Sequence, residues 1–158
     1  MSGATGNLLP SRRIDVEVAD PVAALAGTWF FRRKVTDRTT GLEGQAVGTA
    51  RFEKTGTGLD WTETGTLIIE GHSFDAKRRM AVVRDGESWQ VLFEDGRPFH
   101  DLDLGRGRCS VNHPCGDDFY EGSLALSKVD DETTFVTEWK VTGPRKDQLI
   151  VTVYKRNR

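Results

Sequence analysis

The sequence predicts an all-β protein, a single up-and-down antiparallel β-barrel of about ten strands with a short N-terminal helix. Short segments in which apolar and polar residues alternate recur along the chain, and Gly, Asp, Asn and Pro separate them. No long helical periodicity interrupts these segments. Because closure removes the exposed edges of a sheet, a barrel is the simplest architecture for such a run of strands.

The predicted helix begins after Asp20-Pro21 and ends before Gly27. Asp is a favourable N-cap, Pro suits the first helical position, and Gly ends a helix readily. Residues 1–19 are expected to form a flexible tail ahead of a barrel domain at 20–158. The strands are expected at residues 28–36, 45–54, 59–69, 73–84, 88–94, 98–104, 108–113, 118–127, 133–142 and 148–156, with turns such as Asp85-Gly86, Asp95-Gly96 and Asp130-Asp131 between them.

Composition excludes several classes of function. The chain of 158 residues is expected to form one domain, and its net charge of −2 comes from interspersed acidic and basic residues, which argues against nucleic-acid binding. No apolar run approaches the length of a membrane span, and the N-terminal residues lack the apolar core of a secretory signal. We therefore expect a cytoplasmic protein whose partner is a small molecule. The sequence does not indicate its oligomeric state.

Strand alternation places a charged residue among the inward-facing apolar residues of three strands: Arg33, Glu63 and Arg78. A buried ion needs a partner, so Glu63 is expected to pair with Arg33 or Arg78. The other guanidinium would then be able to bind an anion. The alternative is an internal salt-bridge network, or arginine stems at the barrel mouth. Apolar walls are expected from Phe31, Trp61 and Trp139.

The region from Asp95 to Tyr120 holds two of the three histidines and both cysteines. General acid–base chemistry is one interpretation, with His100 or His113 and Tyr120 as the proton-transferring groups and Asp118 as an orienting carboxylate. The alternative is that these polar groups fix turns, with Arg97 paired to an aspartate. The cluster as a whole is expected to face a ligand.

The other interpretations of this region are weaker. A zinc site needs about three or four ligands, and no paired Cys or His spacing supports one, so no metal is expected. A nucleophilic Cys115 is also disfavoured, because a thiol in a β-barrel is more often a small packing residue. If Cys109 and Cys115 lie on one continuous strand, roughly 20 Å separates them and they are free thiols.

Gly27-Thr28-Trp29 resembles the Gly-x-Trp opening of lipocalins and their calycin relatives. The resemblance implies that Trp29 closes the barrel floor beneath a basic side chain from the last strand. Lys155, Arg156 and Arg158 are available, and Arg156 is preferred. Alternatively, Trp29 is simply a core aromatic residue.

Longer motifs resemble a family of uncharacterised bacterial proteins, a domain of unknown function with a calycin-like barrel. The motifs are Leu25-Ala26-Gly27-Thr28-Trp29 with Arg33, Glu63-Thr64-Gly65, Asp95-Gly96-Arg97-Pro98-Phe99-His100, His113-Pro114-Cys115-Gly116-Asp117-Asp118-Phe119-Tyr120, and Trp139-Lys140-Val141-Thr142-Gly143-Pro144-Arg145-Lys146-Asp147. The resemblance implies the fold but no reaction. The site residues it implies are Arg97, His100, His113, Cys115, Asp118, Tyr120, Trp139, Arg145 and Lys146.

Some calycin-like barrels, the nitrobindins among them, hold haem through a histidine. Neither His72, His100 nor His113 lies in a motif that matches such a site, so no cofactor is expected. Arg145 and Lys146 lie in a turn, where they either steer an anionic ligand or are simply solvated. A third alternative is that Arg145 pairs with Asp118.

The leading hypothesis is a barrel that binds a small, anionic and partly apolar ligand in a polar-lined cavity. One alternative is an enzyme of isomerase, cyclase or hydrolase type that uses His and Tyr in the same cavity. Another is a structural or interaction module without a ligand.

Overall fold

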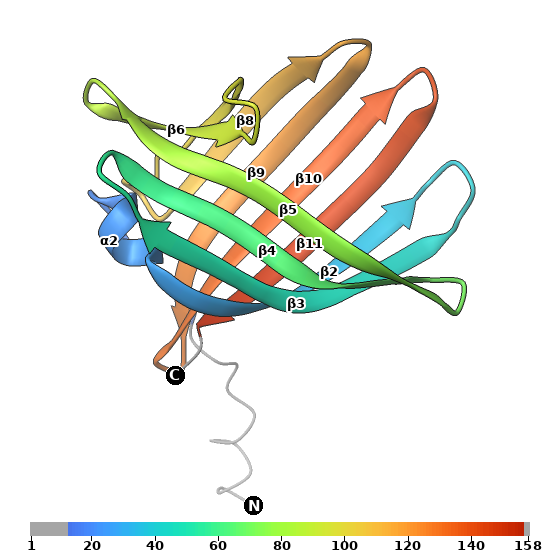
Figure 1. The fold of residues 1–158 in the computed structure, drawn as a ribbon, viewed down its shortest axis with the longest axis horizontal. Coiled ribbons are helices and arrows are strands. Elements are labelled where there is room, and N and C mark those ends of the chain that lie inside the picture. Colours follow the sequence, from blue (N-terminus) through green and yellow to red (C-terminus); the bar gives the residue numbers. More distant parts are fainter. Residues whose placement is uncertain (1–12, 157–158) are drawn as a thin grey trace, which may run out of the picture.

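The computed structural model describes residues 13–156, which form one curled antiparallel sheet and a single short helix (Figure 1). The elements are β1 (Arg13–Asp15), α2 (Pro21–Leu25), β2 (Gly27–Asp37), β3 (Glu43–Lys54), β4 (Gly58–Ile69), β5 (His72–Asp85), β6 (Ser88–Phe93), β7 (Pro98–Asp101), β8 (Arg108–Cys115), β9 (Asp118–Val129), β10 (Glu132–Gly143) and β11 (Lys146–Arg156). The predicted all-β class and the short N-terminal helix are therefore confirmed. No helix among residues 13–156 is long and apolar enough to cross a membrane.

The strands are hydrogen-bonded in the order β1-β9-β10-β11-β2-β3-β4-β5-β6-β7, and β8 also pairs with β9. Figure 1 shows the sheet folding back on itself, so that β3, β4 and β5 face β9, β10 and β11 across the interior. Most of the tail expected at 1–19 and Arg158 lie outside the described residues. Residues 13–15 of that segment form β1, which pairs with β9.

The predicted helix is confirmed as α2, and its capping follows from the sequence. Asp20 is the N-cap, and its side chain accepts hydrogen bonds from the backbone N–H groups of Val22, at 3.0 Å, and Ala23, at 3.4 Å. Gly27 follows the helix with a φ of 125°, a backbone angle that side-chain-bearing residues rarely adopt. The helix therefore ends where β2 begins.

The expected closure of the barrel floor is present. The indole of Trp29 is fully buried, and its Nε1 donates to the carbonyl of Leu25 at 2.8 Å. The guanidinium of Arg156 lies 4.4 Å from the centre of a Trp29 ring, and it also donates to the carbonyls of Ala26, at 3.0 Å, and Ala24. Trp29, α2 and the last strand are thus joined in one cluster.

Most of the inward-facing residues predicted from strand alternation are buried in the structure, whereas Phe74 and Arg78 on the same faces are exposed. The core residues on these faces are Trp29, Phe31, Ala46, Ala50, Phe52, Leu59, Trp61, Met80, Val82, Phe135, Trp139, Val141 and Tyr154. Gly48 and Gly65 face each other on β3 and β4, and a Cβ on either would lie 2.2 Å from a carbonyl oxygen of the facing strand. This close approach is open only to glycine, and it brings the two strands together under Phe31.

The barrel differs from a fully hydrogen-bonded one at a single junction. Among the described residues no backbone ladder joins β7 to β8, although both belong to the same sheet. The strand expected at 98–104 ends at Asp101, and the following segment instead buries Leu102 and Leu104. Cys109 and Cys115 both lie on β8, and both are free thiols as predicted.

Candidate functional site

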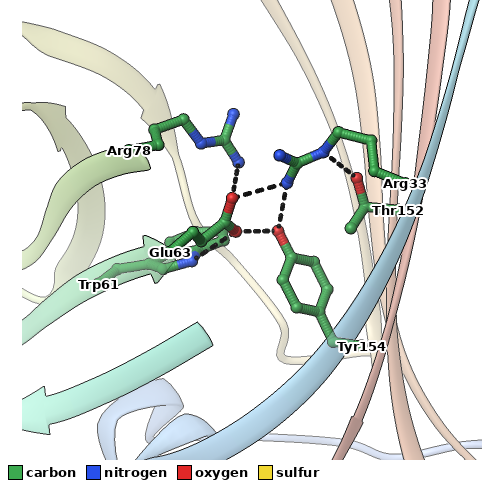
Figure 2. A network of polar contacts seen from close by, with 6 residues as sticks. All are labelled: Arg33, Trp61, Glu63, Arg78, Thr152 and Tyr154. Atoms are coloured by element: carbon green, nitrogen blue, oxygen red, sulfur yellow. Dashed lines mark hydrogen bonds and ion pairs between the residues drawn. The ribbon is translucent and has the colours of Figure 1, made fainter. Parts of the chain in front are cut away.

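A single carboxylate organises the inner face of the sheet (Figure 2). Glu63 on β4 is 2% exposed, and its Oε1 lies 2.7 Å from Arg33 Nη2 and 3.2 Å from Arg78 Nη2. Register explains the second contact, because Glu63 and Arg78 are directly opposite each other on β4 and β5. The pairing that the sequence predicts is therefore present, and it involves both arginines.

Further hydrogen bonds complete the environment of Glu63. Its Oε2 accepts from Trp61 Nε1 at 3.0 Å and from the hydroxyl of Tyr154. Arg33 donates from Nε to Thr152 Oγ1 at 2.8 Å and from Nη2 to the hydroxyl of Tyr154 at 3.2 Å. These contacts define the Glu63 network: Arg33, Trp61, Glu63, Arg78, Thr152 and Tyr154 (Figure 2).

Burial and charge act in opposite directions on Glu63. Burial alone would raise its pKa, but the positive charges of Arg78 and Arg33, with the hydrogen bonds from Tyr154 and Arg33, outweigh it and hold the pKa below its usual value. Glu63 is therefore a carboxylate at neutral pH. Burial and the nearby Glu63 charge raise the pKa of Tyr154, so its hydroxyl stays protonated and acts as a donor.

The Glu63 network carries an excess positive charge, since one carboxylate faces two guanidinium groups. The two arginines differ in accessibility. The Arg33 side chain is 14% exposed and its contacts are made within the network, whereas the Arg78 side chain is 41% exposed. Among the described residues, Glu63 is the only ion-pair partner of Arg78. Most of its N–H donors therefore remain available to an anion.

Apolar side chains lie beside this charge on the same face. Phe74, Leu67, Ala46 and Arg33 are successive cross-strand partners, so their side chains share one side of the sheet. Phe74 is 53% exposed and Leu67 is partly buried. An exposed aromatic ring on the inner face is suited to contact the apolar part of a ligand.

A bulge shapes the second polar region of the inner face. In the β6–β7 pair, Val91 is opposite His100 and Leu92 is opposite Pro98, so Phe99 is an extra residue. Such a bulge turns two successive side chains toward the same side. Both are buried, with Phe99 8% and His100 6% exposed.

Aromatic side chains fill the junction between β7 and β8. Phe99 is stacked on Phe93, with ring centres 4.4 Å apart, and on Trp139, at 5.0 Å. His113 and Tyr120, which are cross-strand partners on β8 and β9, each lie edge-on to Phe99. The aromatic contact between β7 and β8, which no backbone ladder joins, is the edge-on contact of Phe99 with His113.

His100 is the most perturbed histidine in this group. Burial lowers its pKa from 6.5 to about 4, against the opposing effect of Asp101. Its Nδ1 lies 2.8 Å from the carbonyl oxygen of Asp101, and because a carbonyl only accepts, the proton of the neutral ring is on Nδ1. Among the described residues, none of His100, His113 and Tyr120 is hydrogen-bonded to another, so the acid–base pairing stays a prediction.

The remaining predicted residues lie elsewhere. The carboxylate of Asp118 binds Lys146 at 3.2 Å in the neighbouring turn, and among the described residues it has no hydrogen bond to the histidines that it was expected to orient. Arg97 pairs with Asp95 at 2.6 Å rather than with Asp117 or Asp118, in an exposed turn. Arg145 is exposed and Cys115 half-buried, at the end of β8. Within residues 13–156, no three His, Cys, Asp or Glu side chains converge as metal ligands.

Two members of the Glu63 network were not predicted as site residues, Thr152 and Tyr154. Both lie on β11, where residues two apart share a face, so their side chains point to the same side of the sheet as that of Arg156. The sequence signal available for them was a threonine and a tyrosine two residues apart on the last strand, which places both side chains on one face. This spacing alone does not identify their partners, because only the pairing of β11 with β2 places Thr152 opposite Arg33.

The outer face of the sheet carries a hollow with exposed apolar side chains. A hollow of about 730 Å³ lies there, lined by Phe30, Arg32, Val47, Thr49, Val153 and Lys155 among others. Phe30 is 53% and Val47 44% exposed. This surface lacks the buried charge and the aromatic cluster of the inner face.

The structure is that of an all-β protein, in which one curled antiparallel sheet forms a half-barrel with a tryptophan floor and a buried charged network. Within that class, the chain belongs to a family of unknown function, DUF6314, whose model matches residues 25–156. The structure is similar to that of the S-type phycobiliprotein lyase CPES from Guillardia theta, with a TM-score of 0.57, 8% sequence identity, and coverage of 84% of this chain and 88% of that chain. At this identity the likeness shows the fold alone. No curated protein matches the sequence.

Proposed function

We propose that the protein binds a small, anionic and partly apolar molecule on the inner face of its sheet. The observation that carries this proposal is the charge imbalance of the Glu63 network, in which the half-exposed Arg78 shares a single carboxylate with Arg33. A guanidinium with free N–H groups binds carboxylate or phosphate oxygens in a bidentate manner.

The two arginines have separate roles in this proposal. Arg33 holds Glu63 and Tyr154 in place through its contacts within the network. Arg78 receives the anionic group, because it is the accessible one. Aromatic side chains of the inner face contact the apolar part of the ligand.

The proposal is tested with 2-naphthoate, a small apolar anion, and 2-naphthamide, its neutral counterpart. Binding is followed by the fluorescence of the protein's tryptophans and by the rise in melting temperature. We expect the wild type to prefer the carboxylate and Arg78→Gln to lose about tenfold or more in affinity for it.

Arg79→Gln is the matched control. Arg79 neighbours Arg78 on β5, and strand alternation places its side chain on the opposite face. Removing this arginine changes the net charge equally but leaves the Glu63 network intact. Equal affinities of the two variants for 2-naphthoate, or equal affinity of the wild type for acid and amide, would refute the proposal.

A further inference from the structure

His100 points toward the inner face of the sheet. It is the cross-strand partner of Val91, which in turn faces Val82, and both valines are fully buried in the core. Directly opposed residues of neighbouring strands share a side of the sheet. The imidazole of His100 therefore lies on the same face as the Glu63 network.

The free nitrogen of His100 is an acceptor. Nδ1 donates its proton to the carbonyl of Asp101, so Nε2 carries the lone pair in the neutral ring. Burial keeps the ring neutral at physiological pH by lowering its pKa to about 4. At neutral pH, Nε2 is therefore able to accept a hydrogen bond and has no proton to donate.

The free nitrogen of His100 is unpaired within the described part of the chain. Nε2 has no hydrogen-bond partner among these residues, and the residue as a whole is 6% exposed.

The surroundings of His100 join it to the anion site. Its ring centre lies 4.8 Å from that of Phe99 and 5.1 Å from that of Trp139. Strand register places Arg78 on the same face: Arg78 and Val82 share one face of β5, and Val82 leads across Val91 to His100. The charged and titratable groups that act on the pKa of His100 are Asp101, His113 and Arg78. An acceptor, an aromatic wall and a cationic group therefore share one part of the inner face.

We propose that the ligand is an aromatic carboxylate that also carries a hydroxyl or N–H group, and that His100 Nε2 accepts a hydrogen bond from this group. The proposal rests on the proposed function, in which Arg78 binds the carboxylate. It adds a specificity: a ligand that covers His100 without supplying a donor leaves a buried acceptor unpaired. Sites of this kind discriminate strongly against analogues that lack the donor.

The test uses hydroxy-2-naphthoates in which the hydroxyl occupies different ring positions. Each is compared with the methoxy compound of the same position and with 2-naphthoate, neither of which has a donor. We expect at least one hydroxy compound to bind the wild type about tenfold more tightly than both controls. His100→Phe, with its fold checked by circular dichroism, should lose that preference and still bind 2-naphthoate.

A second measurement needs no variant. The ¹⁵N resonance of His100 Nε2 should shift in the wild type when the preferred hydroxy compound binds, because the nitrogen accepts a new hydrogen bond. An unchanged resonance would overturn the inference. Arg78-dependent binding of all compounds without any preference for a hydroxyl would also overturn it, but would leave the proposed function standing. Absence of Arg78-dependent binding by every compound would overturn the proposed function, and this inference with it.

Discussion

Acidification from pH 7 to pH 5 is expected to destabilise the folded protein through His100. In the folded state burial lowers the pKa of His100 from 6.5 to about 4. Between these values the unfolded chain takes up a proton at His100 and the folded chain does not. Proton uptake by the unfolded state alone favours unfolding, so the free energy of unfolding falls as the pH falls.

The size of the effect follows from the difference in proton affinity. Each pH unit in this window is worth 1.36 kcal/mol, so the loss between pH 7 and pH 5 is about 2 kcal/mol. Between pH 6.5 and pH 4 it reaches about 3 kcal/mol. The lowered pKa of His100 already includes the effects of its charged and titratable neighbours. Asp101 raises this pKa, and His113 and Arg78 lower it.

The assay is urea unfolding at a series of pH values, followed by tryptophan fluorescence, on the wild type and His100→Gln. The variant lacks the titrating ring. Between pH 7 and pH 5 its free energy of unfolding should therefore fall by about 2 kcal/mol less than that of the wild type. His72→Gln, at an exposed position at the start of β5, controls for the substitution itself. The same acid-induced loss in the wild type and His100→Gln would refute the assignment of a buried neutral imidazole.

Two further predictions concern the packing of the inner face. Glu63→Gln should lower the free energy of unfolding by about 3 kcal/mol, because it leaves Arg33 buried without its counter-charge. Asp60→Asn, on the same strand, should have little effect, and equal losses would contradict the buried pair. Gly122→Ala should cost about 1–3 kcal/mol and shift the tryptophan fluorescence, since its Cβ would lie 2.4 Å from the ring of Trp139. Gly56→Ala, where a Cβ meets nothing within 4 Å, is its control, and an unshifted spectrum for Gly122→Ala would contradict the packing.

The strand faces were predictable from the sequence. A two-residue alternation of side chains is a property of each strand alone, so it does not depend on which strands become neighbours. It placed Glu63 and both of its arginine partners on inward faces. The short helix was predictable for a similar reason, because Asp20, Pro21 and Gly27 act on their own local backbone.

Tertiary structure alone decided how the second polar region is built. Simple alternation turns Phe99 and His100 to opposite sides, but the bulge against Val91 turns both inward, and a bulge is defined by the pairing of two strands. Likewise, Asp118 binds Lys146 because the β10–β11 turn lies beside the start of β9.

The sequence by itself therefore determined the class of fold and the inward charges, both of which follow from local periodicity and local backbone preference. The tryptophan floor was implied by the resemblance of Gly27-Thr28-Trp29 to the opening of lipocalins. Only the tertiary structure joined Thr152 and Tyr154 to the Glu63 network, and only it left β7 and β8 to meet through an edge-on aromatic contact. Both features depend on the register between strands distant in sequence, for which the side chains of a single strand carry no information.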